Sequence, residues 1–239
     1  MLLADVALVI GAYILGSVPY MILLGRAKKI DLSQEEDLHI ALWRKVGRIE
    51  GFSGILVDVL KGAIPVVIGF IFDFHLAVIA AAGVAAVAGQ MWSVFQKFDA
   101  ERGNTAGLGM IIALTVGVSV TESPRACLVL LFALIPPITG FLIRTIPRFV
   151  SPGQTLSERF MLGGPVSNSL PLGVAVGLIL APLSSWCLEQ PVEMTLGLLA
   201  LFVAIMVRRL TVGLRADLKT ATSIRSILIN RLLYDRSYL

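Results

Sequence analysis

The chain has 239 residues, of which 56% are hydrophobic and 15% are charged, and its mean hydropathy is +0.86. A water-soluble domain has a smaller apolar share and about a quarter of charged residues, so this composition excludes an ordinary soluble protein. The formal net charge is +4, but the basic residues lie between long uncharged runs and form no single stripe, which argues against nucleic-acid binding.

Seven apolar segments follow one another along the chain. A helix needs about 20 mostly apolar residues to cross a bilayer. Five segments meet this requirement without a charged residue, and a sixth contains Asp58 and Lys61. The seventh segment is short, so the arginines that follow it must extend their side chains to the membrane interface. The predicted spans are residues 6–25, 52–72, 76–95, 103–121, 126–143, 162–188 and 194–207. We therefore predict an all-α, polytopic membrane helix bundle with about seven transmembrane helices.

The distribution of basic residues tests this count, because short cytoplasmic loops hold most of the lysines and arginines of a membrane protein. With seven spans, the loop and tail lysines and arginines fall on one side of the bilayer, and the other side holds only Arg125. This places the N-terminus outside and the C-terminus in the cytoplasm. Residues 1–211 form the predicted membrane domain. Residues 212–239 form a basic cytoplasmic tail, either an amphipathic helix on the inner leaflet or a partly disordered terminus.

The sequence contains no motif for zinc, redox chemistry or a prosthetic group, so we expect neither a metal nor a cofactor. Cys127 and Cys187 form no CxxC pair, and they are either two free thiols or one disulfide. An internal repeat, which many transporters have, is also missing.

Two polar elements interrupt the first two spans. The first is Gly16-Ser17-Val18-Pro19-Tyr20, near the cytoplasmic half of its span. Ser17 lies beside a proline break, and its hydroxyl either donates to a ligand oxygen or bonds back to the preceding helical turn. The second element is Asp58 and Lys61, whose i, i+3 spacing places both charges on one helix face. We expect that face to point into the bundle, as a functional or a purely structural pair.

A third polar element joins the third and fourth spans, and a glycine-rich turn closes it. Its notable residues are Gly89, Gln90, Lys97, Asp99, Glu101, Arg102, Gly103 and Asn104. A glycine-rich turn that opens a helix favours phosphate, because free backbone N–H groups and the helix dipole attract an anion. The two basic residues strengthen such a site and the two acidic residues weaken it, so an ordinary cytoplasmic turn is the alternative.

In order and near spacing, the three elements resemble the acyl-phosphate-dependent glycerol-3-phosphate acyltransferases of bacteria, the PlsY family. The most specific part is Leu60-Lys61-Gly62-Ala63-Ile64-Pro65, and the resemblance is good over roughly the first 115 residues. It implies a seven-helix enzyme of the cell membrane that transfers a fatty acyl group from acyl phosphate to glycerol-3-phosphate. The products are lysophosphatidate, for phospholipid biosynthesis, and phosphate. The resemblance also implies a site that faces the cytoplasm and uses neither a metal nor coenzyme A.

Matching the family's motifs to this chain predicts six substrate-binding residues. They are Ser17 of the first motif, Arg44 at the end of the second, Lys61 of the Lys-Gly-Ala-x-Pro run, Arg102 in place of a lysine, Gly103 after it, and Asn104. By this match Arg44, Lys61 and Arg102 hold phosphate groups, and Ser17 orients a ligand oxygen. No catalytic residue is assigned.

The chain departs from the family at several of these motifs. The glycine-rich second motif is replaced by the acidic segment 33–41, and the histidine of the third motif is Gln90. Gln90 cannot take a proton as imidazole can, and Asp99-Ala100-Glu101 replaces a Lys-Gly-Gly triplet and repels phosphate. His39 either substitutes for the lost histidine or is a solvated loop residue. The reaction survives this loss if a substrate phosphate accepts the hydroxyl proton.

Three functions follow from these observations. We favour the acyltransferase, with glycerol-3-phosphate, acyl phosphate and membrane lipids as its partners. The lost second motif favours instead a catalytically silent paralogue that binds lipid or a membrane protein. The charged pair at membrane depth is also compatible with a transporter of small anions, although the missing repeat argues against it.

Overall fold

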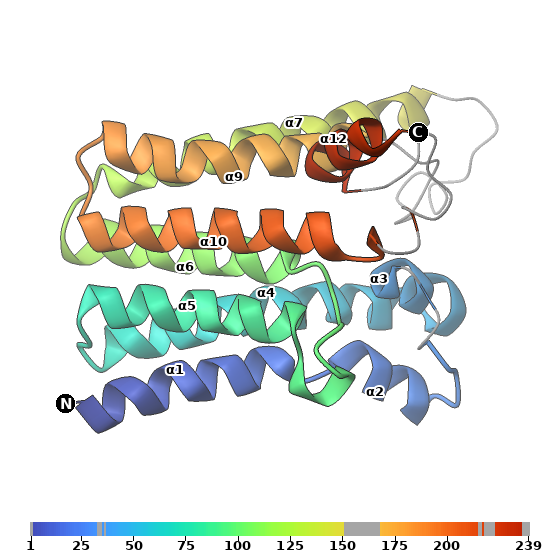
Figure 1. Cartoon of the computed structure of the whole chain (residues 1–239), viewed down its shortest axis with the longest axis horizontal. Helices are drawn as coiled ribbons and strands as arrows, with labels where there is room; N and C mark the ends of the chain where they lie inside the picture. Colours follow the sequence, from blue (N-terminus) through green and yellow to red (C-terminus); the bar gives the residue numbers. More distant parts are fainter. Residues whose placement is uncertain are drawn as a thin grey trace. The chain divides into compact units, whose positions relative to one another are not determined.

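The computed structural model describes residues 2–32, 35, 37–150, 168–214, 217 and 223–235. Within these ranges the chain is helical and has no β-strand. The helices are α1 (Leu2–Ser17), α2 (Tyr20–Ala27), α3 (Leu38–Ala41), η1 (Leu42–Val46), α4 (Arg48–Ile71), α5 (Leu76–Met91), η2 (Val94–Gln96), α6 (Asn104–Thr121), α7 (Ala126–Val150), α9 (Ser169–Cys187), α10 (Val192–Thr211) and α12 (Ile224–Tyr234) (Figure 1).

Six helical segments are long and apolar enough to cross a membrane: α4, α5 continued through η2 (Leu76–Gln96), α6, α7, α9 and α10. A seventh span is formed if α1 and α2, which meet at an angle of 41°, are taken together. The break falls at Val18 and Pro19, because proline lacks an N–H and disfavours helix in the residue before it. The predicted all-α membrane bundle is therefore confirmed. Residues 162–167 of the predicted sixth span lie outside the described residues, and α9 begins at Ser169.

The chain divides into two compact units, and the boundary falls within α6, between Leu114 and Thr115. The first unit contains α1 to α5 and the N-terminal part of α6, and it carries all six predicted site residues. The second unit contains the end of α6 with α7, α9, α10 and α12.

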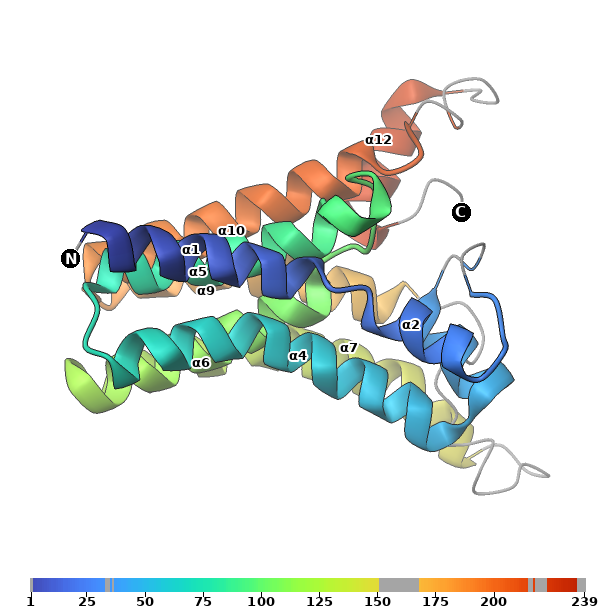
Figure 2. The same cartoon turned by 90° about the horizontal axis from the view of Figure 1, so that it is seen from below.

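Glycines bring the helices of the first unit into backbone contact. A Cβ built at Gly16 of α1 would lie 1.9 Å from the carbonyl oxygen of Ala86, and Figure 2 shows α1 running along α5. A Cβ at Gly62 of α4 would lie 1.9 Å from the carbonyl oxygen of Ala106 in the first turns of α6. Small residues allow this close approach of membrane helices. As a result, the polar residues of α4 lie beside the N-terminal end of α6.

The second unit is held together by close packing and by buried arginines. A Cβ at Gly173 of α9 would lie 2.4 Å from the carbonyl oxygen of Pro136, so α7 and α9 also pack backbone to backbone. Arg209 of α10 is buried, and its guanidinium donates to the carbonyl oxygen of Leu232 at 3.0 Å, which fixes α12 to α10. Cys127 and Cys187 are exposed free thiols, so the disulfide left open by the sequence is not formed.

Candidate functional site

A buried ion pair lies on α4 at the centre of the candidate site. Nζ of Lys61 is 2.9 Å from Oδ1 of Asp58, and the two side chains are 4% and 0% exposed. The i, i+3 spacing on a helix brings the two charges together, as the sequence predicted. Each charge compensates the other, because a buried ion without a partner is costly. The predicted orientation of this face toward the interior is confirmed.

A histidine from a neighbouring segment contacts the other oxygen of the same carboxylate. His39 belongs to the short helix α3, which is capped by the Asp37 side chain accepting from the backbone N–H of Ile40 at 3.1 Å. Nε2 of His39 lies 3.3 Å from Oδ2 of Asp58, and the His39 side chain is 22% exposed. His39 is therefore not a solvated loop residue but part of a cluster around Asp58.

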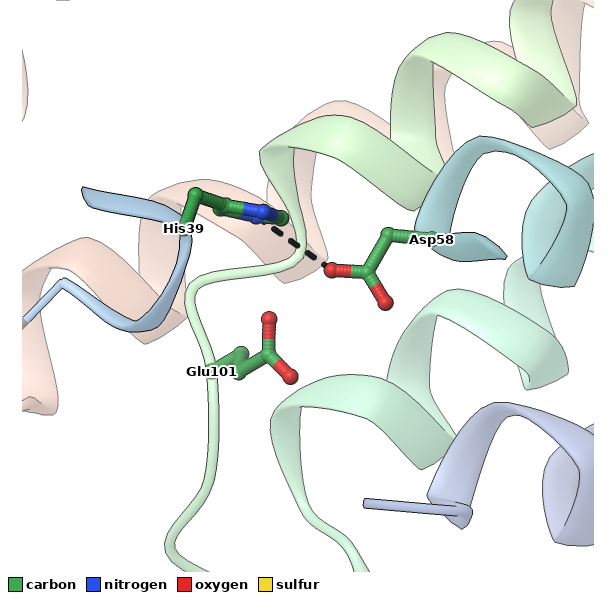
Figure 3. Close-up of side chains that lie close together, drawn as sticks. All are labelled: His39, Asp58 and Glu101. Atoms are coloured by element: carbon green, nitrogen blue, oxygen red, sulfur yellow. Dashed lines mark ion pairs between the residues drawn. The ribbon is translucent and has the colours of Figure 1, made fainter. Parts of the chain in front are cut away.

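A second carboxylate approaches from the loop between η2 and α6. The backbone N–H of Glu101 donates to the carbonyl oxygen of Gln90 at 3.2 Å, and the Gln90 side chain donates to Oε2 of Glu101 at 3.2 Å. Burial raises the pKa of the half-buried Glu101 well above its ordinary value; the negative charge of Asp58 raises this pKa further, and Lys61 opposes the shift. Figure 3 shows the side chains of His39, Asp58 and Glu101 directed toward one another.

The turn that opens α6 is the part of the site that resembles a phosphate cradle. Gly103 is buried and has φ of +76°, a left-handed conformation that glycine adopts without strain. A Cβ at this position would meet the Met91 side chain at 2.6 Å. Asn104 begins α6, so the first N–H groups of an 18-residue helix follow directly. Gly62 packs against Ala106 in the first turns of α6, and Lys61 directly precedes Gly62 in α4. Lys61 therefore lies near this end of α6.

The other predicted residues lie at different places in the same unit. Ser17 ends α1, and its buried hydroxyl donates to the carbonyl oxygen of Tyr13 at 2.9 Å. The hydroxyl thus bonds back to the preceding helical turn, which is the second of the two roles that the sequence allows. The carbonyl oxygen of Ser17 accepts from the Ser93 hydroxyl at 2.6 Å. Arg44 is exposed on η1, and Arg102 is half-buried in the loop before α6. The structure thus brings Lys61, Gly103 and Asn104 to the contact between α4 and α6.

Comparison with known proteins decides the family. The family model described as glycerol-3-phosphate acyltransferase matches residues 6–216, most of the chain. The chain belongs to the glycerol-3-phosphate acyltransferase family. The resemblance inferred from the motifs is therefore confirmed, and the match extends well beyond the first 115 residues, where the motif resemblance is good.

Curated relatives of this family align with less than half of the chain. The glycerol-3-phosphate acyltransferase of Geotalea daltonii is 34% identical over 115 residues, which are 47% of this chain and 59% of that protein. The enzyme of the same name from Rubrobacter xylanophilus is 37% identical over 113 residues, 46% of this chain and 57% of that protein. The aligned part of the chain thus spans less than two thirds of the length of these relatives.

Two crystal structures share the fold over nearly the whole chain. Both are of PlsY (YgiH), an integral membrane glycerol 3-phosphate acyltransferase, one in its lysophosphatidic acid form and one in its glycerol 3-phosphate form. The lysophosphatidic acid form superposes with a TM-score of 0.63, and the match covers 91% of this chain and 93% of that one. The glycerol 3-phosphate form superposes with a TM-score of 0.64, and the match covers 91% of this chain and 92% of that one. Both are 23% identical to this chain in sequence. The likeness shows that this family member has the helical membrane fold of those proteins.

Sequence reasoning missed the cluster formed by His39, Asp58 and Glu101. From the sequence, His39 is either a substitute for the lost histidine or a solvated loop residue, and Glu101 is a residue that repels phosphate. The three lie on separate segments, so no helical period links them. The one available signal was Asp58, because an ionisable group at membrane depth usually faces the bundle interior and has polar partners there.

Proposed function

We propose that this protein is a membrane acyltransferase that transfers a fatty acyl group from acyl phosphate to glycerol-3-phosphate. The observation that carries the proposal is the buried Lys61, held by Asp58 beside the first turns of α6 in a chain of the glycerol-3-phosphate acyltransferase family. A buried ammonium group next to the N-terminus of a helix suits a phosphorylated substrate, because both favour negative charge. The acceptor and the donor of this reaction each carry a phosphate.

The chemistry needs little from the protein beyond binding and charge stabilisation. The hydroxyl oxygen of glycerol-3-phosphate attacks the acyl carbonyl carbon, the bond from that carbon to the phosphate oxygen breaks, and phosphate leaves with the bonding electrons. The hydroxyl proton passes to the leaving phosphate, which makes the loss of the family's histidine at Gln90 tolerable. Products are lysophosphatidate and inorganic phosphate.

The proposed roles of the site residues follow from their chemistry. Lys61, Arg102 and Arg44 hold phosphate oxygens, and cations placed where negative charge develops stabilise the transition state. Gly103 and Asn104 supply backbone N–H groups at the start of α6, and Ser17 orients a ligand oxygen. Arginine in place of lysine at position 102 keeps the charge and adds a planar fork that binds two phosphate oxygens at once.

The site is proposed to face the cytoplasm, in a cell membrane, with the N-terminus of the chain outside. The basic loops support this orientation through the positive-inside rule. We also propose that residues 1–211 form the membrane domain and that the tail, 212–239, lies on the inner leaflet. In support, Ile224, Ile229 and Leu233 of α12 are exposed, and such side chains insert among lipid headgroups while basic residues bind anionic lipid.

Acyl transfer by the purified full chain in lipid nanodiscs tests the proposed function. The protein is given palmitoyl phosphate and labelled glycerol-3-phosphate, and the label is followed into lysophosphatidate. We expect product from the natural sequence, and its loss in Lys61→Ala and Arg102→Ala. Lys45→Ala, which removes an exposed lysine of η1 paired with Glu35, is the matched control and should keep activity.

Two outcomes contradict the proposal. A folded protein that binds lipid but gives no product is a silent member of the family. Uptake of labelled glycerol-3-phosphate into proteoliposomes without any acyl transfer indicates a transporter.

A further inference from the structure

Three side chains with metal-binding atoms converge in the first unit. They are His39 from α3, Asp58 from α4 and Glu101 from the loop before α6 (Figure 3). One ligand atom of each lies within 4.8 Å of those of the other two. Atoms bound to one divalent cation lie about 3–4 Å apart, since each metal–ligand bond is about 2.0–2.2 Å long. Small side-chain movements therefore suffice to convert this cluster into a coordination shell.

Hydrogen bonding at the cluster gives an independent indication of a ligand. Asp58 is fully buried, and its Oδ2 atom lies 3.3 Å from Nε2 of His39 but has no donor in hydrogen-bond geometry. Its other oxygen, Oδ1, is already bound by Lys61 at 2.9 Å. Buried polar atoms are almost always satisfied, so an unsatisfied carboxylate oxygen beside a histidine nitrogen points to a positively charged ligand.

Charge at the cluster gives the same indication. Lys61 compensates the charge of Asp58, and ionisation of the nearby Glu101, whose pKa is raised, would add a second negative charge to the cluster. Glu101 stands in the turn where a phosphate would approach the start of α6, and a carboxylate there repels it. A divalent cation bound to both carboxylates reverses this effect, because the cluster then attracts phosphate.

We propose that His39, Asp58 and Glu101 together bind one divalent cation of the kind that accepts an imidazole nitrogen with two carboxylate oxygens, such as Mn²⁺ or Zn²⁺. The imidazole ligand favours these ions over Mg²⁺ and Ca²⁺, which take mainly oxygen ligands. Three protein ligands leave further coordination positions open to phosphate oxygens. That role in holding substrate rests on the proposed function, whereas the cation site itself does not.

Binding of Mn²⁺ to the full chain in nanodiscs tests the proposal. The protein is first treated with a chelator and freed of it, and free Mn²⁺ is then followed by electron paramagnetic resonance during titration. We expect one bound Mn²⁺ per chain, displaced by Zn²⁺. His39→Gln and Glu101→Gln should each raise the Kd at least tenfold, the usual effect of losing a group at a metal site.

Two matched variants separate this effect from general damage. His75→Gln changes the chain's other histidine, which is exposed at the start of α5, and Glu122→Gln changes an exposed glutamate after α6. Both should bind Mn²⁺ as the natural sequence does. Thermal unfolding confirms that each variant is folded, and Asp58 is left in place because Lys61 depends on it.

The outcomes distinguish the cation site from the proposed function. A folded natural protein that binds neither Mn²⁺ nor Zn²⁺ at millimolar concentration, or unchanged binding in His39→Gln and Glu101→Gln, overturns the proposal. Acyl transfer that persists without any cation bound contradicts the role of the cation in holding phosphate, but it supports the acyltransferase function. A bound cation without acyl transfer leaves the site standing and contradicts the acyltransferase.

Discussion

Nζ of Lys61 lies 2.9 Å from Oδ1 of Asp58, one helical turn away on α4, and both side chains are buried. Neither charge is exposed to water, so each depends on the other for compensation. Removing one member of a buried pair costs about 3–5 kcal/mol, because it leaves the other charge without a partner. The stability of α4 in its site therefore depends on keeping both charges of this buried pair.

Lys61→Met should therefore lower the stability of the protein by about 3–5 kcal/mol. Lys45→Met, which breaks an exposed pair with Glu35, should lower it by at most about 1 kcal/mol. The melting temperatures of the two variants in the same nanodiscs provide the comparison. Adding Asp58→Asn to Lys61→Met should restore part of the loss, and equal melting temperatures for both single variants would argue against a stabilising pair.

Gly62→Ala should separate α4 from α6. The added Cβ would lie 1.9 Å from the carbonyl oxygen of Ala106, a backbone atom that cannot rotate away. Overpacking of this kind costs about 1–3 kcal/mol, so the melting temperature should fall. Gly11→Ala on α1 is the matched control, since nothing lies within 4 Å of its new Cβ. That variant should be neutral or slightly stabilising, because alanine is the better helix former.

Arg44→Ala should weaken substrate binding and leave the fold intact. Arg44 is exposed on η1, and loss of a hydrogen bond to a charged group costs about 1.5–3 kcal/mol. We expect the KM for glycerol-3-phosphate to rise roughly 10- to 100-fold, with a smaller change in kcat. Arg48→Ala, which removes another exposed arginine one turn further along, should have little effect. Equal kinetic constants for the two variants would remove Arg44 from the site.

Arg209→Met should loosen α12 from the second unit. It removes hydrogen bonds from the guanidinium to the carbonyl oxygens of Leu232 and Pro171. Amide hydrogen exchange over Ile224–Tyr234 should accelerate about tenfold, because losing one to two hydrogen bonds lowers the local opening free energy by about 1–2 kcal/mol. Arg225→Met, at an exposed position on α12, should leave the exchange unchanged.

The sequence predicted the helices well because the bilayer constrains them strongly. A span needs about 20 apolar residues, and such runs are visible without any knowledge of packing. The break between α1 and α2 follows from Pro19, whose effect is local. The π-helical turn Leu42–Val46 was not predicted, since no residue pattern distinguishes it from the α-helix before it. The orientation of the termini stays a prediction.

The site was predicted only where its contacts are local. Asp58 and Lys61 are one turn apart, so their pairing follows from helix geometry. The approach of His39 and Glu101 to the same carboxylate depends on how α3 and the loop before α6 fold onto α4, which no short-range pattern encodes. For the same reason, the burial of Glu101 was not expected from an acidic turn near the membrane surface.

Release of phosphate that depends on the acceptor tests the central claim most directly. The natural protein in nanodiscs is given palmitoyl phosphate alone, with glycerol, or with glycerol-3-phosphate, and both phosphate and lysophosphatidate are measured. The acyltransferase account predicts phosphate release only with glycerol-3-phosphate, with one phosphate released for each lysophosphatidate formed. Arg102→Ala should abolish this release, and Lys45→Ala should keep it. Release that is absent from the folded protein, or that is the same without an acceptor, would contradict it.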